Sequence, residues 1–187
     1  NSDEPDVAPQ RRITLSAYYI DRYAVSLQLY RQCVSSGKCS APEAEEYCNW
    51  GKTGKDSHPV NCISWFQADE YCRWAGKLLP TEAQWEKAAA GPRPRRYPWG
   101  KQAPDCALAN FALNPDKKQY CQEGTAAVDK YPGGASPYGA VQMAGNVFHW
   151  VKDWYGKGYY RSSEAKDPMG PFEGKYRVVR GGSWFSR

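Results

Sequence analysis

The sequence lacks several features that would assign a function quickly. It has no run of about 18 apolar residues, so none of it reads as a membrane-spanning helix. It has no CxxC pair, which argues against a zinc ribbon or a thioredoxin-type redox motif. Only two histidines occur, His58 and His149, and the sequence places no serine beside His149 and Asp153. A Ser–His–Asp hydrolase is therefore not indicated, although Asp153 follows His149 by four positions.

Charge is also modest. The chain has 25 basic and 20 acidic residues and a formal net charge of +5. The densest basic run, Arg93-Pro94-Arg95-Arg96, is typical of a solvated loop. Basic and aromatic residues do not interleave into a nucleic-acid surface, so we expect no nucleic-acid partner.

Aromatic residues, glycine and proline are abundant. Of the 187 residues, 8 are Trp, 14 Tyr, 17 Gly and 14 Pro, while regular apolar periodicity is scarce. The length suits one domain with a real core. The composition predicts a loop-rich α+β domain held together by aromatic side chains, and neither a helix bundle nor a doubly wound sheet.

Seven cysteines are many for a cytosolic chain of this size. Local spacing favours three bridges, Cys33–Cys39, Cys48–Cys62 and Cys106–Cys121, although six cysteines allow about 15 pairings and proximity is only a guide. Cys72 is then left over. Disulfides persist in oxidising compartments, so we expect a periplasmic, cell-surface or secreted protein. The chain starts at Asn1 without methionine, which we interpret as a processed or trimmed chain.

Three helices are predicted from their caps. Ser26 precedes a helix over about 27–35 that ends at Gly37. The stretch Ser64-Trp65-Phe66-Gln67 is a capping box that opens a helix to about Ala75. The stretch Thr81-Glu82-Ala83-Gln84 opens a third helix through Ala90, and the indole of Trp85 is expected to anchor it to the body of the domain.

The remaining elements are short. Residues 1–10 are polar and are expected to form a flexible tail before a domain over 11–187. Alternation over 12–20 predicts a half-buried strand. Short strands are also expected near 126–131, in the segment that ends at Trp154, and over 176–180. The pair Gly181-Gly182 marks a bend or a close approach of the backbone.

Four stretches, in this order and spacing, carry a resemblance to a known family. They are Asp21-Arg22-Tyr23 with Val25-Ser26, the run 74–86 (WAGKLLPTEAQWE), the run 143–150 (MAGNVFHW) and the run 177–184 (RVVRGGSW). The sequence resembles the formylglycine-generating enzyme, or sulfatase-modifying factor, family from about Arg11 to Arg187. The resemblance implies a C-type-lectin-like fold with small mixed sheets and about three helices.

The founding activity of that family is the oxidation of a peptide cysteine to formylglycine, with O2 and copper held by two cysteines. The resemblance places the first of these cysteines at Ser186, two positions after the Ser183-Trp184 pair, and the second after Arg187. A hydroxyl is a poor ligand for Cu(I) compared with a thiolate. We therefore expect no copper at this site and no catalytic residue in the neighbouring groove at Ser183 and Trp184.

The resemblance also implies two calcium sites. One would use Asn110 and Phe111, but its acidic partner aligns near Tyr120, and Asp116 substitutes only if the loop differs. The other matches four positions that here carry Gln142, Gly145, Val147 and His149. Calcium prefers oxygen ligands and His149 offers nitrogen, so we expect this second site to be empty.

The leftover thiol of Cys72 is explained by the resemblance alone. In the family, a cysteine at this position bonds to one in the C-terminal tail, so we expect the natural protein to continue past Arg187. Intact mass and a thiol count test that expectation.

Three functions stay open on the sequence. The first is a non-catalytic module that recognises a protein, peptide or glycan through the remnant groove near Ser183, Trp184 and Ser186, bordered by Trp154, Tyr159 and Tyr160. The second is a copper- and O2-dependent oxidase whose ligands come from elsewhere. The third is a structural subunit of an envelope complex. His58, in a loop before Pro59, is interpreted as structural.

Overall fold

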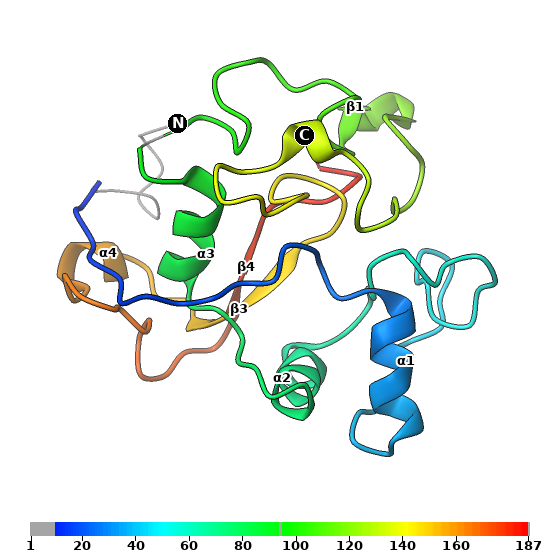
Figure 1. The fold of residues 1–187 in the computed structure, drawn as a ribbon, viewed down its shortest axis with the longest axis horizontal. Coiled ribbons are helices and arrows are strands. Elements are labelled where there is room, and N and C mark those ends of the chain that lie inside the picture. The colour runs from blue at the N-terminus through cyan, green and yellow to red at the C-terminus, as the bar shows by residue number, and fades with distance from the viewer. Residues whose placement is uncertain (1–9, 94, 187) are drawn as a thin grey trace.

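The computed structural model describes residues 10–93 and 95–186, which form the irregular α+β arrangement of Figure 1. In this part of the chain no helix has the length and apolarity needed to cross a membrane. The expected flexible tail at 1–10 lies outside the described residues except for Gln10.

The three predicted helices are confirmed. They are α1 (Leu27–Ser35), α2 (Trp65–Trp74) and α3 (Glu82–Ala90). The capping boxes at the starts of α2 and α3 are both complete. At α3, for example, Thr81 Oγ1 accepts a hydrogen bond from the backbone N–H of Gln84 at 3.2 Å, and Gln84 Oε1 accepts from the Thr81 N–H at 2.9 Å. Each box satisfies two N–H groups that a helix start otherwise leaves without a partner.

A fourth helix, α4 (Tyr159–Ser162), was not predicted. It is a single turn that follows Gly158, whose φ of 77° is left-handed, and it has no side-chain cap. With neither a capping residue nor apolar periodicity, the sequence contains no signal that would find it.

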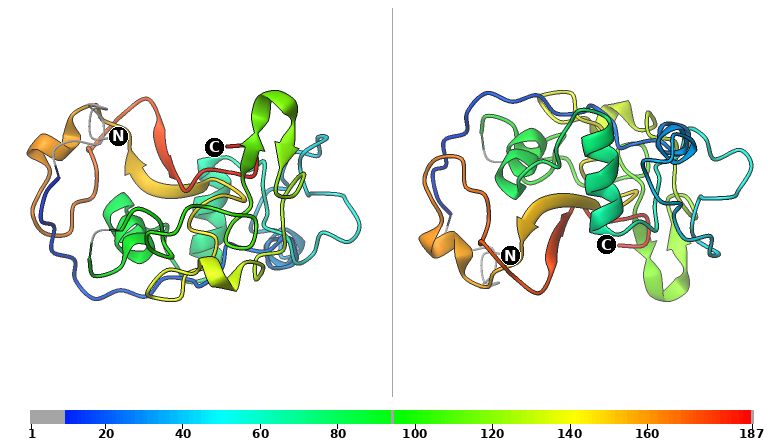
Figure 2. Two further views of the ribbon diagram at one scale, coloured as in Figure 1. Left: turned by 90° about the horizontal axis from the view of Figure 1, so that it is seen from above. Right: turned by 90° about the horizontal axis from the view of Figure 1, so that it is seen from below.

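Two antiparallel strand pairs complete the fold. The strand β3 (His149–Trp154) pairs with β4 (Arg177–Arg180), and an irregularity in register separates the pairs Trp150↔Val179 and Trp154↔Arg177. The helix α3 lies against this ribbon (Figure 1). The second pair is β1 (Ala112–Asn114) with β2 (Gln119–Tyr120) around the 3₁₀ turn η1 (Pro115–Lys117). It projects beside the C-terminal end of the chain (Figure 2), where the Ala112 N–H donates to the Ser186 carbonyl at 2.9 Å.

The strand predicted over 12–20 is wrong. Only Thr14 forms a bridge, to Lys166, and the segment otherwise runs as irregular chain between α4 and α1. The ladder stops because the carboxylate of Asp167, and not a backbone carbonyl, accepts from the Ser16 N–H at 2.7 Å. The alternation then changes face, since Tyr18 points inward to the Gln84 carbonyl while Tyr19 is fully exposed. The expected strand near 126–131 is also not formed; a turn leads there into the 3₁₀ turn η2 (Pro132–Gly134).

The core has two parts. One gathers around α1 and α2 and includes Leu27, Tyr30 and Tyr71, with the two tyrosine rings stacked 5.6 Å apart. The other gathers between α3 and β3 and includes Trp85, Met143 and Val151. Trp85 is buried, which confirms its anchoring role.

Three disulfides join the pairs that local spacing favours. The Cα–Cα distances are 5.3 Å for Cys33–Cys39, 5.6 Å for Cys48–Cys62 and 5.1 Å for Cys106–Cys121, all ordinary for such bonds. They close the loops that follow α1 and the loop that carries β1 and β2, where regular hydrogen bonding is sparse. Cys72 is free and partly buried.

Candidate functional site

The chain turns sharply where β4 ends. Gly181 and Gly182 have φ values of 95° and 73°, in the region that favours glycine. A Cβ on Gly181 would lie 3.2 Å from the ring of Trp85. The Gly181 carbonyl accepts a hydrogen bond from the Gly145 N–H at 2.7 Å. The glycine pair therefore brings the segment 183–186 against the core, in agreement with the expected bend.

Ser186, which the sequence resemblance places at the first copper cysteine, is held by hydrogen bonds. Its Oγ lies 2.8 Å from the Oγ of Ser183 and accepts from the Ser183 N–H at 3.2 Å. The Ser186 N–H donates in turn to the Ser183 carbonyl at 3.0 Å. The Ser186 hydroxyl oxygen is a hard metal ligand, and it is already hydrogen-bonded within a local turn. This corner therefore does not fit Cu(I).

Aromatic side chains surround this corner. Trp184 is buried, with its ring centroid 5.0 Å from Tyr120, 5.8 Å from Tyr47 and 5.3 Å from Phe185. Phe185 is half exposed and lies 6.2 Å from Phe148. These rings give the corner a rigid apolar surface.

A groove of about 1030 Å³ passes this corner. We call it the apolar groove; its lining includes Ser183, Trp184, Phe185, Phe148 and Leu78. Three residues expected from the sequence along its border line a different cavity instead. They are Trp154, Tyr159 and Tyr160. Two of them belong to the unpredicted helix α4, and for that reason their position was misjudged.

Cys72 also lines the apolar groove. Burial, with a smaller contribution from Asp69, raises the pKa of its thiol to about 11. The sulfur is therefore protonated at neutral pH and is a poor nucleophile or metal ligand.

Asn110 and Phe111 do not present free oxygen ligands. The Asn110 amide is fully buried; it donates to the Gly124 carbonyl at 2.9 Å and accepts from the Gln122 N–H at 3.0 Å. The Phe111 carbonyl accepts from the Cys121 N–H at 3.0 Å. Asp116 is exposed on η1. Because these oxygens already hold the loop together, this arrangement fits calcium poorly.

The second set of calcium positions forms a network of amides. Gln142 donates to the carbonyls of Ala127 at 2.7 Å and Lys130 at 3.1 Å, and its Oε1 accepts from Asn146 at 2.6 Å. The carbonyl of Gly145 accepts from the N–H of Val147 at 2.9 Å. These oxygens also have partners within the chain, so the set does not fit a hard cation.

His149 packs against Trp85 of the core and is partly buried, at the lining of the apolar groove. Its Nδ1 accepts from the indole N–H of Trp85 at 3.1 Å, and burial lowers the pKa of the ring to about 4. The ring is therefore neutral at pH 7, with its proton on Nε2. Asp153 is bonded to the Glu82 N–H at 2.8 Å, so His149 and Asp153 do not form a relay. In the described part of the chain no three His, Cys, Asp or Glu residues cluster as metal ligands.

His58 has a structural role. Its Nδ1 lies 2.8 Å from the hydroxyl of Thr125, which accepts a hydrogen bond from the buried Asn49 at 3.0 Å. Burial, followed by the charge of Lys55, lowers the pKa of His58. The ring is thus part of the packing that joins the loop after α1 to residues near 125.

Similarity to known proteins covers the whole chain. The family described as "Sulfatase-modifying factor enzyme 1-like domain" matches residues 1–187. A serine/threonine-protein kinase pkn1 from Chlamydia caviae is 37% identical over 97% of this chain and 30% of its own length. A formylglycine-generating enzyme from Streptomyces coelicolor is 41% identical over 71% of this chain and 44% of its own length.

The fold has solved counterparts as well. The structure of Treponema denticola variable protein 1 superposes with a TM-score of 0.75 at 23% identity, over 100% of this chain and 80% of that one. The chain spans 30% of the length of the kinase relative, so that protein's activity does not pass to it with the similarity. Motifs, fold and family match agree: the chain belongs to the sulfatase-modifying factor family.

Proposed function

We propose that this chain is a non-catalytic recognition domain of the family, which binds a protein or peptide partner along the apolar groove in an oxidising compartment outside the cytoplasm. One observation carries the proposal. The Ser186 oxygen, which the resemblance places where the copper-binding thiolate would be, is engaged by Ser183, and the apolar groove lies beside it. Three disulfides support the compartment.

Relatives that contain this domain are named for different activities. One is named for protein phosphorylation and another for formylglycine generation, yet both share this domain. One scaffold thus accompanies different chemistries, as is common when function depends on a grafted site.

The groove suits a partner with apolar side chains. Phe148 and Phe185 are 46% and 52% exposed and lie together at its wall. Exposed aromatic side chains that meet in a groove are typical anchors of peptide recognition. We expect the bound segment to present aromatic or aliphatic residues at alternate positions.

Peptide selection tests this proposal. A random decapeptide library is selected on the protein, and the best peptide is synthesised and titrated by calorimetry. We expect Phe185→Ala to weaken its binding about tenfold, because truncating a central aromatic anchor costs about 1–2 kcal/mol. Phe172→Ala is the matched control, since Phe172 is 98% exposed and does not line the groove. Equal losses in both variants would contradict the proposal.

An oxidase is the second candidate, because a relative named as a formylglycine-generating enzyme is 41% identical over 71% of this chain. Copper competition against bicinchoninate, followed by O2 uptake with a cysteine-containing peptide, separates the two. We expect the protein to retain no Cu(I) and O2 uptake to stay at background. Copper-dependent O2 uptake that also converts the peptide would favour the oxidase.

A further inference from the structure

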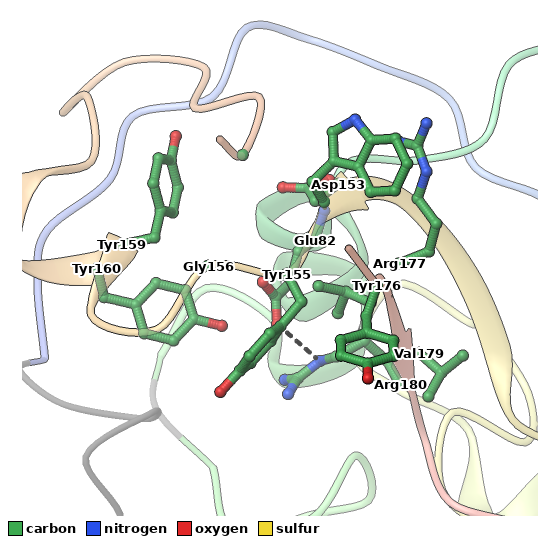
Figure 3. Close-up of a pocket in the computed structure, with 13 residues that line it drawn as sticks. Glu82, Asp153, Tyr155, Gly156, Tyr159, Tyr160, Tyr176, Arg177, Val179 and Arg180 are labelled. Atoms are coloured by element: carbon green, nitrogen blue, oxygen red, sulfur yellow. Dashed lines mark hydrogen bonds and ion pairs between the residues drawn. The ribbon is translucent and has the colours of Figure 1, made fainter. Parts of the chain in front are cut away.

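A second cavity, of about 400 Å³, lies between α4, the end of β3 and β4 (Figure 3). We call it the tyrosine cavity. Of the residues that line it, Val179 alone also lines the apolar groove, so the two are separate places. None of the family positions for copper or calcium discussed above belongs to its lining.

Four tyrosines contribute to its wall. Tyr159 and Tyr160 come from α4, with ring centroids 6.5 Å apart. Tyr155 directly follows β3 and Tyr176 directly precedes β4 (Figure 3). Tyr155 and Tyr176 keep 40% and 61% of their surface exposed. The cavity thus offers flat apolar ring faces with polar edges.

Two carboxylates supply acceptors. Asp153 is buried at the wall, where one oxygen accepts from the Glu82 N–H at 2.8 Å, and no Lys or Arg of the described residues forms an ion pair with it. Glu82 accepts from the hydroxyl of Tyr160 and lies 3.7 Å from Arg180 Nε. Burial raises the pKa of Asp153 to about 6, which reflects the weak compensation of its charge.

The cavity is also lined by arginines with unused donors. Arg180 forms ion pairs with Glu86 through Nη2 at 3.5 Å and with Glu82 through Nε at 3.7 Å, and the buried Nε makes no hydrogen bond. The Nε of Arg177 also lacks a hydrogen-bond partner, but that guanidinium is stacked on the indoles of Trp65 and Trp154. A buried N–H without a hydrogen bond is unfavourable, and an oxygen from water or from a ligand can satisfy it.

The formal charges of the residues that line the cavity cancel. Asp153 and Glu82 carry two negative charges, and Arg177 and Arg180 carry two positive charges. A cationic ligand would face the guanidinium of Arg180, and an anionic ligand would face the two carboxylates. The lining therefore selects neither sign, and a neutral ligand that both donates and accepts hydrogen bonds is matched best.

We propose that the tyrosine cavity binds the pyranose ring of a neutral sugar. Hydroxyl groups both donate and accept, so a sugar can donate to a carboxylate of the lining and accept from the Arg180 Nε. The C–H face of the sugar stacks on the exposed rings of Tyr155 and Tyr176. The volume is within the range of small-ligand sites. The proposal does not depend on the function of the apolar groove.

The test uses defined sugars and saturation-transfer NMR on the whole chain. The probes are the methyl α-pyranosides of glucose, galactose and mannose, and N-acetylglucosamine. A ligand of this size gains about 4 kcal/mol, which corresponds to a Kd of about 1 mM. We expect at least one probe to bind near that affinity, and Tyr176→Ala to weaken it about fivefold.

Two comparisons keep the test specific. Tyr138→Ala is the matched control, since Tyr138 is 55% exposed and lies outside the cavity; it should leave binding unchanged. Asp153→Asn preserves the shape of the side chain and should also weaken the sugar. Near-ultraviolet circular dichroism checks that each variant is folded.

Tetramethylammonium chloride and sodium acetate serve as charged probes. Tighter binding of either one in the cavity would overturn the proposal. So would the failure of every sugar to saturate below about 20 mM, or sugar binding that Tyr176→Ala leaves unchanged. The copper and peptide experiments use other residues, so their failure is distinguishable from this one.

Discussion

Arg177 is the side chain whose removal should affect stability most clearly. Its guanidinium carbon lies 3.7 Å from the ring centroid of Trp65 and 3.4 Å from that of Trp154, so the cation is stacked between two indoles. Its Nη1 donates to the Lys152 carbonyl at 2.7 Å. The stack joins α2 to the β3–β4 ribbon, and Arg177→Ala removes it.

The magnitude follows from these contacts. Each cation–π contact contributes about 0.5–2 kcal/mol, and the hydrogen bond about 1 kcal/mol. We expect Arg177→Ala to lower the free energy of unfolding by about 3 kcal/mol, equivalent to a Tm lower by about 6–12 °C for a chain of this size. Arg177→Lys keeps the charge but loses the flat stack and the forked donors, and should cost about half as much.

Guanidinium chloride unfolding followed by circular dichroism at 222 nm measures these losses. Arg161→Ala, at an exposed position on α4, is the control and should change stability by less than about 0.5 kcal/mol. A double-mutant cycle with Trp65→Leu isolates the contact, and we expect a coupling of about 1 kcal/mol. Coupling near zero would show that the stack is a geometric coincidence and refute the reasoning.

The other predictions concern local structure and pH. Thr81→Ala breaks the capping box of α3 and should cost about 1 kcal/mol in chemical denaturation. Replacing Cys48 and Cys62 together by serine opens a loop with a sequence separation of 14 and should cost about 3 kcal/mol, measured as a lower Tm in calorimetry. His149, with its pKa lowered to about 4 by burial, should make stability fall as pH drops from about 6.5 to about 4, because the unfolded chain binds that proton more tightly. The pKa of Asp153 is raised to about 6, so this group makes stability rise as pH falls from about 6 to 4. The contribution of His149 is therefore measured in the Asp153→Asn variant, as the free energy of unfolding against pH. A flat profile in that variant would contradict the prediction.

The parts of the fold that sequence predicted are those with local signals. The boxes at Ser64 and Thr81 carry their own hydrogen bonds, and the bridge Cys48–Cys62 closes within one loop. Such features depend on residues a few positions apart. The resemblance then supplied the long-range order that the composition alone leaves open.

The parts that failed depend on distant partners. Alternation over 12–20 predicted a strand, but a strand needs a neighbour, and Asp167 takes over the pairing after Thr14. The tyrosine cavity was missed because it needs α4, which has no cap, and because Asp153 and Glu82 are 71 positions apart. The stack of Arg177 on Trp65 has no sequence signal for the same reason.

The amide network has a consequence for the lifetime of the protein. Asn110 and Asn146 are fully buried, and Asn146 bonds to both Gln142 and the Ala126 backbone, so uncharged groups fasten the middle of the molecule. Hydrogen bonds between neutral amides do not depend on salt, but amide side chains can deamidate slowly. Deamidation of either asparagine would place a carboxylate in this buried network of neutral groups. Burying an uncompensated charge is unfavourable, so one hydrolysed amide would destabilise the middle of the molecule.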